Sequence, residues 1–374
     1  MQVSHGKEHV KEQTRAFLKS AYREFYFGRG STIEFPEALG SREFGFMPFG
    51  GGMIRHLSFK DSGAALAEIV RQSPSSVYCS NATYDFPTLP IEEKGWMGAE
   101  LIFDIDATDI PTSCKRDHDL WYCENCHSSG KLPRLPECPK CGGSTNEYHG
   151  TCEVCLAAAK EHTTRVVEFL TEDFGVPREL VKAYFSGNRG YHLHVLDDRF
   201  SRLSPTARAE VAGYIRGESL PAGQTIAAAL RRRRADAGPE GEGWARRITT
   251  YVEARRSGHS GTLQKLVSEA ITSERAFIDS SVTTDIHRVF RLAGTLHGAT
   301  GMSKSHVSEL ESFDPATEAI ALPGRSVKVN VSFYPRFDIG RRSFGPFKSE
   351  TAELPTFAAI QILTRGLGEV SLGA

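Results

Sequence analysis

The chain has 374 residues, enough for two or three domains, and its 40% hydrophobic and 24% charged residues are ordinary for a globular protein. A formal net charge of −1 excludes binding of nucleic acid through a strongly basic overall field, so such contacts must come from local patches and bound metals. No run approaches the roughly 18 apolar residues that span a bilayer, and the polar residues 1–14 do not form a signal peptide, so we expect a cytoplasmic protein with no membrane contact.

The first part of the chain predicts a helix followed by a pair of strands. Apolar residues at helical spacing favour a helix over residues 8–27. The runs 42–46 and 53–59 flank a turn of three glycines, and we expect them to form a β-hairpin. Another helix is expected around residues 62–71.

The next strand ends in two carboxylates. Successive side chains along the run Leu101–Asp106 point to opposite faces of a strand, so Asp104 and Asp106 point the same way, about 7 Å apart. Two like charges held side by side repel unless a cation lies between them. Mg²⁺ or Mn²⁺ ions are the usual occupants, because they bind carboxylate and phosphate oxygens together. An isolated pair of this kind is more often two solvated aspartates, so the rest of the chain must decide.

Seven of the eight cysteines lie between Cys114 and Cys155. Clustered C-x-x-C pairs in a cytosolic chain are typical of metal ligands rather than disulfides. With one histidine, the seven thiolates make eight ligands, enough for two closed tetrahedral zinc sites that stabilise the fold and leave no position open for catalysis. These ligands are Cys114, His118, Cys123, Cys126, Cys138, Cys141, Cys152 and Cys155.

The pairing of the eight ligands is open at this point. The C-x-x-C pairs 123–126 and 138–141 look like a self-contained zinc ribbon, which leaves the outer four ligands for a second site. His127 and His149 are competing ligands.

The rest of the chain predicts one α+β core that is interrupted by the cysteine-rich segment and by a helical insertion. Helices are expected over 155–173, 205–215, 224–234 and 244–251, with a break at 238–243. Strands are expected over 180–185, 190–196, 276–279 and 327–333. The helical insertion, residues 203–273, carries arginines at 231–234, 246, 247, 255 and 256. They are either a template contact or a solvated helix face.

A second polar cluster lies in the segment 186–194. Its two glycines let the backbone approach a ligand, and Ser186, Arg189 and His192 are donors that suit a triphosphate. His192 and His194 share one strand face. Further along the chain, Asp279 could supply a third carboxylate and His297 could meet the phosphates.

Together these motifs resemble those of the small, catalytic subunit of archaeal and eukaryotic DNA primases, most closely the archaeal form. The resemblance extends from about Phe17 to Tyr334. The matching residues are Arg42–Phe46, Met53, Arg55 and His56, Phe103–Asp106, the cysteine and histidine ligands, Ser186, Gly187, Arg189, Gly190 and His192, Asp279, Arg288, Arg291 and Leu292, and Leu296–Gly298.

The resemblance implies a primase catalytic core of mixed β-sheets flanked by helices. It implies that Asp104, Asp106 and Asp279 bind the catalytic Mg²⁺ or Mn²⁺. It implies that the nucleotide phosphates are held by Arg55, Ser186, Arg189, His192 and His297. The family's zinc falls on Cys114, His118, Cys152 and Cys155, and the other four cysteines then form an extra ribbon with a second zinc.

Four units are expected from this reading. The catalytic core comprises residues 1–113, 156–202 and 274–340. The zinc-binding module is 114–155, the helical subdomain is 203–273, and residues 341–374 are a C-terminal extension.

Three positions depart from the family pattern. Asn188 lies where the family often has a cation, His194 where it often has Trp, and Ala299 where it has Lys. The missing lysine should weaken triphosphate binding unless Lys304 or an arginine replaces it.

The expected function is synthesis of short primers de novo on single-stranded DNA for replication, by two-metal transfer of NTPs or dNTPs. Such a DNA-directed nucleotidyltransferase would pair with a primase large subunit in the primosome of an archaeal-type cell, near the nucleoid. Two alternatives stay open. One is a primase-like polymerase in repair or in a mobile element, and the other is a non-enzymatic zinc-ribbon protein that binds nucleic acid.

Overall fold

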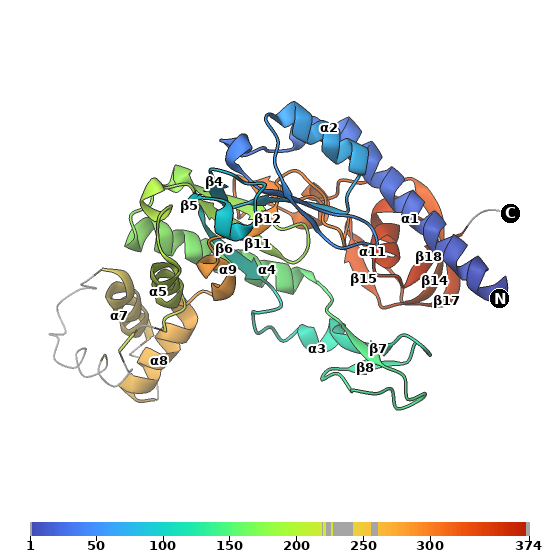
Figure 1. Ribbon diagram of the computed structural model, residues 1–374. Coiled ribbons are helices and arrows are strands. Elements are labelled where there is room, and N and C mark those ends of the chain that lie inside the picture. Colours follow the sequence, from blue (N-terminus) through green and yellow to red (C-terminus); the bar gives the residue numbers. More distant parts are fainter. Residues whose placement is uncertain (1, 219, 222–225, 227–241, 256–260, 372–374) are drawn as a thin grey trace.

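The computed structural model describes residues 2–218, 220, 221, 226, 242–255 and 261–371 (Figure 1). Two four-stranded sheets occupy the middle of the molecule. A cysteine-rich module projects from them, a helical unit lies at one end, and the two chain termini lie at the other. Within the described residues, no helix has the length and apolar character needed to cross a membrane. The expected mixed α+β class is confirmed.

Both central sheets are antiparallel throughout. The first has the order β12-β3-β1-β2, and the second has the order β13-β10-β11-β6. The strands of the first sheet are β1 (Phe44–Met47), β2 (Ile54–Leu57), β3 (Ser76–Ser80) and β12 (Val289–Arg291). Those of the second are β6 (Leu101–Asp106), β10 (Val181–Phe185), β11 (Gly190–Val195) and β13 (Ser305–Val307). The expected β1–β2 hairpin and β10–β11 pair are confirmed.

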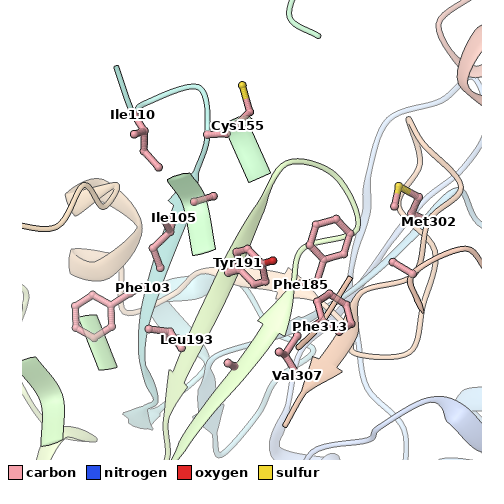
Figure 2. Packing of buried hydrophobic residues seen from close by; sticks show 14 of the residues in the cluster. Phe103, Ile105, Ile110, Cys155, Phe185, Tyr191, Leu193, Met302, Val307 and Phe313 are labelled. Atoms are coloured by element: carbon pink, nitrogen blue, oxygen red, sulfur yellow. The ribbon is translucent and has the colours of Figure 1, made fainter. Parts of the chain in front are cut away.

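Strand β6 forms as its alternation predicts. Phe103 and Ile105 are fully buried and lie beside Leu193 and Tyr191 of β11 (Figure 2). Helix α4 (Glu153–Glu168) packs on β6 and β11 and continues as a π-helical turn, Phe169–Asp173. Each fully buried large apolar side chain contributes about 1.5–3 kcal/mol, so this face fixes the register and leaves the polar face to the site.

The two sheets meet at Phe290 of β12. Its ring packs edge-on against His192 and His194 of β11, with centroids 5.7 and 5.9 Å apart. Phe290 also packs with Ile102 of β6 and with Val282. A small two-stranded sheet of β4 (Ala82–Tyr84) and β5 (Trp96–Ala99) lies beside the two central sheets (Figure 1).

The N-terminal and C-terminal parts pack together. Helix α1 (Gln2–Arg29) and α2 (Ser62–Gln72) agree with the expected helices. A three-stranded sheet, β17-β14-β18, is covered by α11 (Thr356–Thr364), which is almost fully buried. The strands are β14 (Ser326–Tyr334), β17 (Phe347–Pro355) and β18 (Gly368–Val370). The hairpin β15 (Phe337–Ile339) and β16 (Arg342–Phe344) adjoins them.

The boundary expected at residue 341 therefore passes through paired strands. Both β17 and β18 pair with β14, which lies before that boundary. The amide of Val370 also donates to the Thr14 hydroxyl at 3.1 Å, which ties the end of the chain to α1.

The helical unit consists of α5 (Pro205–Ile215), α7 (Gly243–Arg255) and α8 (Leu263–Glu274). The helix expected over 224–234 lies, apart from Ile226, outside the described residues, and so do Arg231–Arg234 and Arg256. Arg246 pairs with Glu172, and Arg247 pairs with Glu172 and with Asp173. These two arginines attach the helical unit to the end of α4.

The strand expected over residues 276–279 is wrong. This segment is extended but makes no ladder; instead, the Asp279 amide donates to the Asp104 carbonyl at 3.0 Å. The Asp279 side chain then accepts from the Ser281 amide and caps α9 (Ser280–Thr284). An aspartate at this position favours a helix start over continued strand.

The cysteine-rich module contains α3 (Lys115–His118) and a small sheet with the order β8-β7-β9. Its strands are β7 (Leu120–Cys123), β8 (Ser129–Lys131) and β9 (Thr145–Tyr148). A last short helix, α10 (Pro315–Glu318), follows β13.

Candidate active site and metal-binding groups

Three carboxylates meet beside the end of β6. Asp104 and Asp106 lie on its polar face, and the amide of Asp279 is bonded to the Asp104 backbone. Burial, followed by the charges of Asp106 and Asp279, raises the pKa of Asp104 to about 7. The structure thus brings together the three predicted aspartates from two distant parts of the chain. Their mutual repulsion and their hard oxygen atoms fit divalent cations such as Mg²⁺ or Mn²⁺.

Short side-chain contacts orient two of these carboxylates. Oδ1 of Asp106 accepts from the amide and the hydroxyl of Thr108, at 2.8 and 2.7 Å. Oδ1 of Asp279 accepts from the amide and the hydroxyl of Ser281, at 2.9 and 2.7 Å. One oxygen of each carboxylate is therefore fixed by the residue two positions later.

A fourth carboxylate, Asp109, was not among the predicted site residues. Its pKa is raised by burial and by the nearby charges of Asp106 and Asp279. Arg288 acts in the opposite direction on Asp104, whose pKa it lowers. The sequence signal for Asp109 is its place three residues after Asp106, in the turn that ends the strand.

The predicted phosphate-binding segment lies directly beside the aspartates. In the antiparallel register, His192 is opposite Asp104 and Gly190 is opposite Asp106. The Nε2 atom of His192 lies 3.6 Å from Oδ1 of Asp104, and the Nε atom of Arg189 lies 3.6 Å from Oδ1 of Asp106. A Cβ on Gly190 would come within 2.0 Å of a β6 carbonyl, so only glycine allows this approach.

The turn between β10 and β11 is joined to the loop of His297. The Ser186 hydroxyl accepts from the amides of Asn188 and Gly190, both at 3.3 Å, and so shapes the turn. The Thr300 hydroxyl donates to the Gly187 carbonyl at 2.5 Å. Arg189 and His192 therefore lie beside the aspartates, and the loop of His297 is joined to the same β10–β11 turn.

The histidines here are neutral near pH 7. Burial is the main cause that lowers the pKa of His192 and His297 well below the usual range, and it lowers the pKa of His194 to about 4. His192, which the sequence offered as a donor for a triphosphate, can therefore supply a hydrogen bond but no charge. Positive charge comes from Arg189 and from Arg291, whose guanidinium is close enough to depress the pKa of both His192 and His297.

Two residues named from the sequence point elsewhere. Arg55 lies on β2 of the other sheet, where its guanidinium donates twice to the buried Glu43, at 2.9 and 3.2 Å. Lys304 is buried, and its ammonium lies 3.1 Å from Nε2 of His194 and 2.9 Å from the Arg291 carbonyl. Lys304 therefore does not occupy the place of the missing lysine.

An arginine from the C-terminal part of the chain lies at Ala299 instead. Arg365 donates to the Ala299 carbonyl at 2.8 Å, and its charge contributes to the lowered pKa of His297. No local pattern in the sequence marks this arginine, because it lies 66 residues from Ala299.

Two sets of four ligand atoms converge in the cysteine-rich module, with all atoms of a set within 4.8 Å of one another. The first metal group is Cys114, His118, Cys152 and Cys155, and the second metal group is Cys123, Cys126, Cys138 and Cys141. These sets could each hold a metal ion, and thiolate and imidazole donors in fours fit zinc. The competing histidines are used otherwise: His127 stacks on Phe333, and His149 contacts Asp119 and Glu147.

Comparisons with known proteins agree with this geometry. The family model of the DNA primase small subunit matches residues 145–308. The chain is 35% identical to the DNA primase small subunit of Cenarchaeum symbiosum, over 97% of this chain and 100% of that protein. It is 33% identical to the one from Nitrosopumilus maritimus, with the same coverage. The polymerase domain of Mycobacterium tuberculosis ligase D in complex with DNA is 15% identical over 80% of this chain and 84% of that one, and its TM-score of 0.38 carries no weight here.

Proposed function

This chain belongs to the DNA primase small subunit family, and from that premise we propose that its aspartate cluster catalyses the synthesis of primers on single-stranded DNA. Family membership makes the protein an enzyme that acts on nucleic acid and nucleotides, which excludes the non-enzymatic alternative. One observation carries the assignment of the site: Asp104, Asp106 and Asp279 converge next to a segment rich in phosphate donors.

In this proposal, Asp104, Asp106 and Asp279 hold two Mg²⁺ or Mn²⁺ ions. When bound, these ions activate the attacking 3′-hydroxyl and stabilise the leaving pyrophosphate. The raised pKa of Asp104 supports the assignment, because a site that repels its own negative charge is suited to binding cations.

The remaining side chains would position the incoming nucleotide. Arg189 supplies a fixed charge for the triphosphate, Ser186 and the neutral His192 and His297 supply hydrogen bonds, and Arg365 adds a second charge beside Ala299. Arg55 stays a prediction as a contact for the nucleotide, with 34% of its side chain exposed.

The wider assignment follows the family. We infer zinc in both metal groups with a structural role, and a heterodimer with a primase large subunit. We also infer a replicative role near the nucleoid in the cytoplasm of an archaeal-type cell. We propose the same division into catalytic core, zinc module, helical subdomain and C-terminal extension as the sequence predicted. The C-terminal extension, however, contributes β17 and β18 to the sheet of β14.

The test is primer synthesis on an unprimed single-stranded template, with NTPs or dNTPs, with Mg²⁺ or Mn²⁺, and with or without the large subunit. We expect product from the wild-type chain. We expect Asp106→Asn to lose activity by at least about a hundredfold while it keeps its zinc content. Asp338→Asn, at an exposed position of the β15–β16 hairpin, is the matched control.

Near wild-type activity of Asp106→Asn would refute the assignment of the reaction centre. Product that requires the large subunit supports the replicative role. Product that is independent of it favours a polymerase that acts in repair or in a mobile element.

A further inference from the structure

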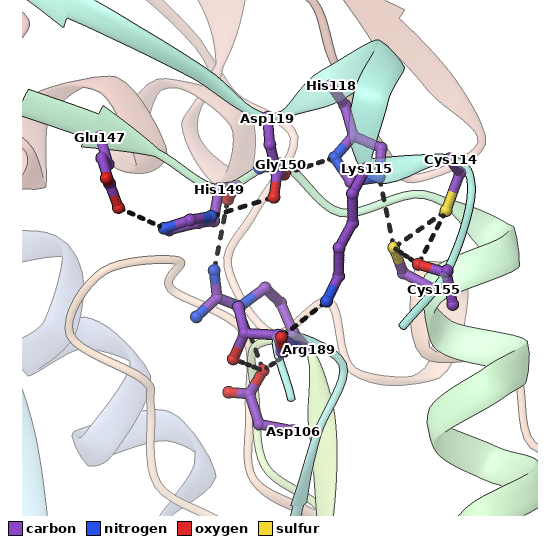
Figure 3. Close-up of polar contacts among 12 residues, drawn as sticks. Asp106, Cys114, Lys115, His118, Asp119, Glu147, His149, Gly150, Cys155 and Arg189 are labelled. Atoms are coloured by element: carbon purple, nitrogen blue, oxygen red, sulfur yellow. Dashed lines mark hydrogen bonds and ion pairs between the residues drawn. The ribbon is translucent and has the colours of Figure 1, made fainter. Parts of the chain in front are cut away.

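The first metal group is connected to the candidate active site by a continuous series of polar contacts (Figure 3). The series begins at His118, whose Nε2 faces the ligand atoms and lies 3.2 Å from Sγ of Cys155. Its other ring nitrogen, Nδ1, lies 2.7 Å from Oδ1 of Asp119. A carboxylate in this position fixes the orientation and tautomer of a metal-binding histidine.

Asp119 makes two further contacts with the chain that follows β9. Its Oδ1 accepts from the Gly150 amide at 3.1 Å, and its Oδ2 lies 3.0 Å from Nδ1 of His149. The residue is 8% exposed, so its charge depends on these partners. One buried carboxylate thus holds the metal ligand and residues 149–150 in a single arrangement.

The backbone of His149 then reaches the site. Its carbonyl accepts from Arg189 at 3.4 Å, and the same guanidinium lies 3.6 Å from Asp106. In Figure 3, Arg189 lies between His149 and Asp106. The position of the guanidinium therefore depends on where the 149–150 segment is held.

A second contact leads from the same module to the same aspartate. The ammonium of Lys115, next to the ligand Cys114, donates to the Thr108 carbonyl at 2.6 Å. Thr108 in turn donates its amide and hydroxyl to Asp106. The residues around the second metal group make different contacts: Tyr122 and His127 stack on the ring of Phe333.

We propose that Asp119 is a positioning residue that couples the first metal group to Arg189, and through it to binding of the nucleotide triphosphate. This inference rests on the proposed function, because it assigns triphosphate binding to Arg189. Truncation of Asp119 to alanine removes both carboxylate oxygens and so releases both His118 and residues 149–150. Zinc affinity then falls, and Arg189 loses the backbone acceptor that holds it in place.

The test compares Asp119→Ala with the wild-type chain at saturating zinc, after elemental analysis has established equal metal content. We expect zinc affinity, measured by competition with a chelator, to fall about 10- to 100-fold. We expect the KM for ATP in primer synthesis to rise on the order of tenfold, with kcat changed by less than about twofold. Equilibrium binding of ATP with Mg²⁺, measured without template, should weaken in parallel.

Two further variants sharpen the test. His149→Ala keeps the contact between Asp119 and His118 but removes the imidazole that ties Asp119 to residue 149, so it should raise the KM for ATP without loss of zinc. Asp117→Asn, an exposed carboxylate on the same helix α3, should leave zinc affinity, KM and kcat unchanged.

An unchanged KM and unchanged ATP affinity in Asp119→Ala at full zinc content would overturn the inference. If that variant does not fold, an unchanged KM in His149→Ala overturns it. A wild-type chain that makes no primer even with the large subunit present contradicts the proposed function instead, and the zinc and ATP binding measurements still decide the role of Asp119.

Discussion

At the scale of single residues, the surroundings change the chemistry of groups that look ordinary in the sequence. Burial, followed by the charges of Asp106 and Asp279, raises the pKa of Asp104 to about 7, well above the ordinary value of an aspartate. His192 and His297 change in the other direction, and burial keeps them neutral. The site thus combines carboxylates that need a cation with imidazoles that carry no charge.

The Asp104 carboxyl should make stability depend on pH. Because its pKa is raised on folding, the folded chain keeps a proton that the unfolded chain has released between about pH 4 and 7, so this residue lowers stability as the pH rises through that window. In zinc-loaded protein without Mg²⁺ or Mn²⁺, we expect Asp104→Asn to have the higher Tm at pH 8 and a similar Tm near pH 4. Thermal unfolding across this range measures it.

Addition of Mn²⁺ at pH 8 should raise the Tm of the wild-type chain and not that of Asp104→Asn, because an ion that binds only the folded state stabilises it. Asp338→Asn should behave as wild type. If the Tm of the wild type and that of Asp104→Asn changed with pH in parallel, the charge of the Asp104 carboxylate would not destabilise the folded chain.

At the scale of elements, the two metal groups differ in what surrounds them. Cys155 and Tyr148 belong to the main hydrophobic cluster, and Cys114 and Cys152 pack against it. The buried cysteines of the second metal group, Cys123 and Cys138, are outside that cluster. We therefore expect a metal ion in the first group to stabilise the core directly, and one in the second group to stabilise mainly its own ribbon.

Substitution of one ligand in each metal group tests this difference. We expect Cys126→Ser to lower the zinc content from two ions to one, with little change in the global unfolding transition and with primer synthesis retained. We expect Cys155→Ser to lose zinc as well, but to destabilise the whole protein, since metal binding supplies folding energy where the ligands join the core. Elemental analysis and thermal unfolding measure both effects. Equal loss of stability in the two variants would contradict the distinction.

At the scale of the whole molecule, a buried polar network holds the two central sheets together. Lys304 contacts His194 of β11 and the Arg291 carbonyl of β12. His194 also binds Glu100, which pairs with Arg42 at 2.7 Å. These side chains border a cavity of about 980 Å³ between the sheets. Because side chains that border this cavity lack packing partners there, the polar network and Phe290 provide much of the contact between the two sheets.

Lys304→Met should therefore destabilise the protein. The change leaves the Nε2 atom of His194 and the Arg291 carbonyl without their partner, and an unsatisfied buried group costs about 1–3 kcal/mol. Chemical denaturation gives the free energy of unfolding. Lys328→Met, at an exposed position of β14, is the control, and equal stability of the two variants would show that the sheets do not depend on this contact.

Local patterns were sufficient for much of the fold and for part of the site. Alternation predicted β6, β10 and β11, and helical periodicity predicted α1, α2, α4 and α5. The spacing of the cysteines suggested the two inner pairs as one possible group, because a C-x-x-C pair constrains its own geometry, and the ligand atoms of the folded chain converge in that division. The segment 276–279 misled the same reasoning, since an apolar run that precedes a helix cap looks like a strand.

By itself, the sequence determined which residues could do chemistry here: the alternate aspartates on one strand face, the ligands at fixed spacing and the donors of segment 186–194. Only the tertiary structure decided how they combine. The approach of Asp279 to Asp104, the pairing of Arg55 with Glu43 and the place of Arg365 beside Ala299 all join residues far apart in the chain. The charge states of the histidines depend on burial. Strand and helix periods arise between near neighbours, whereas contacts and burial arise only when the sheets and helices pack.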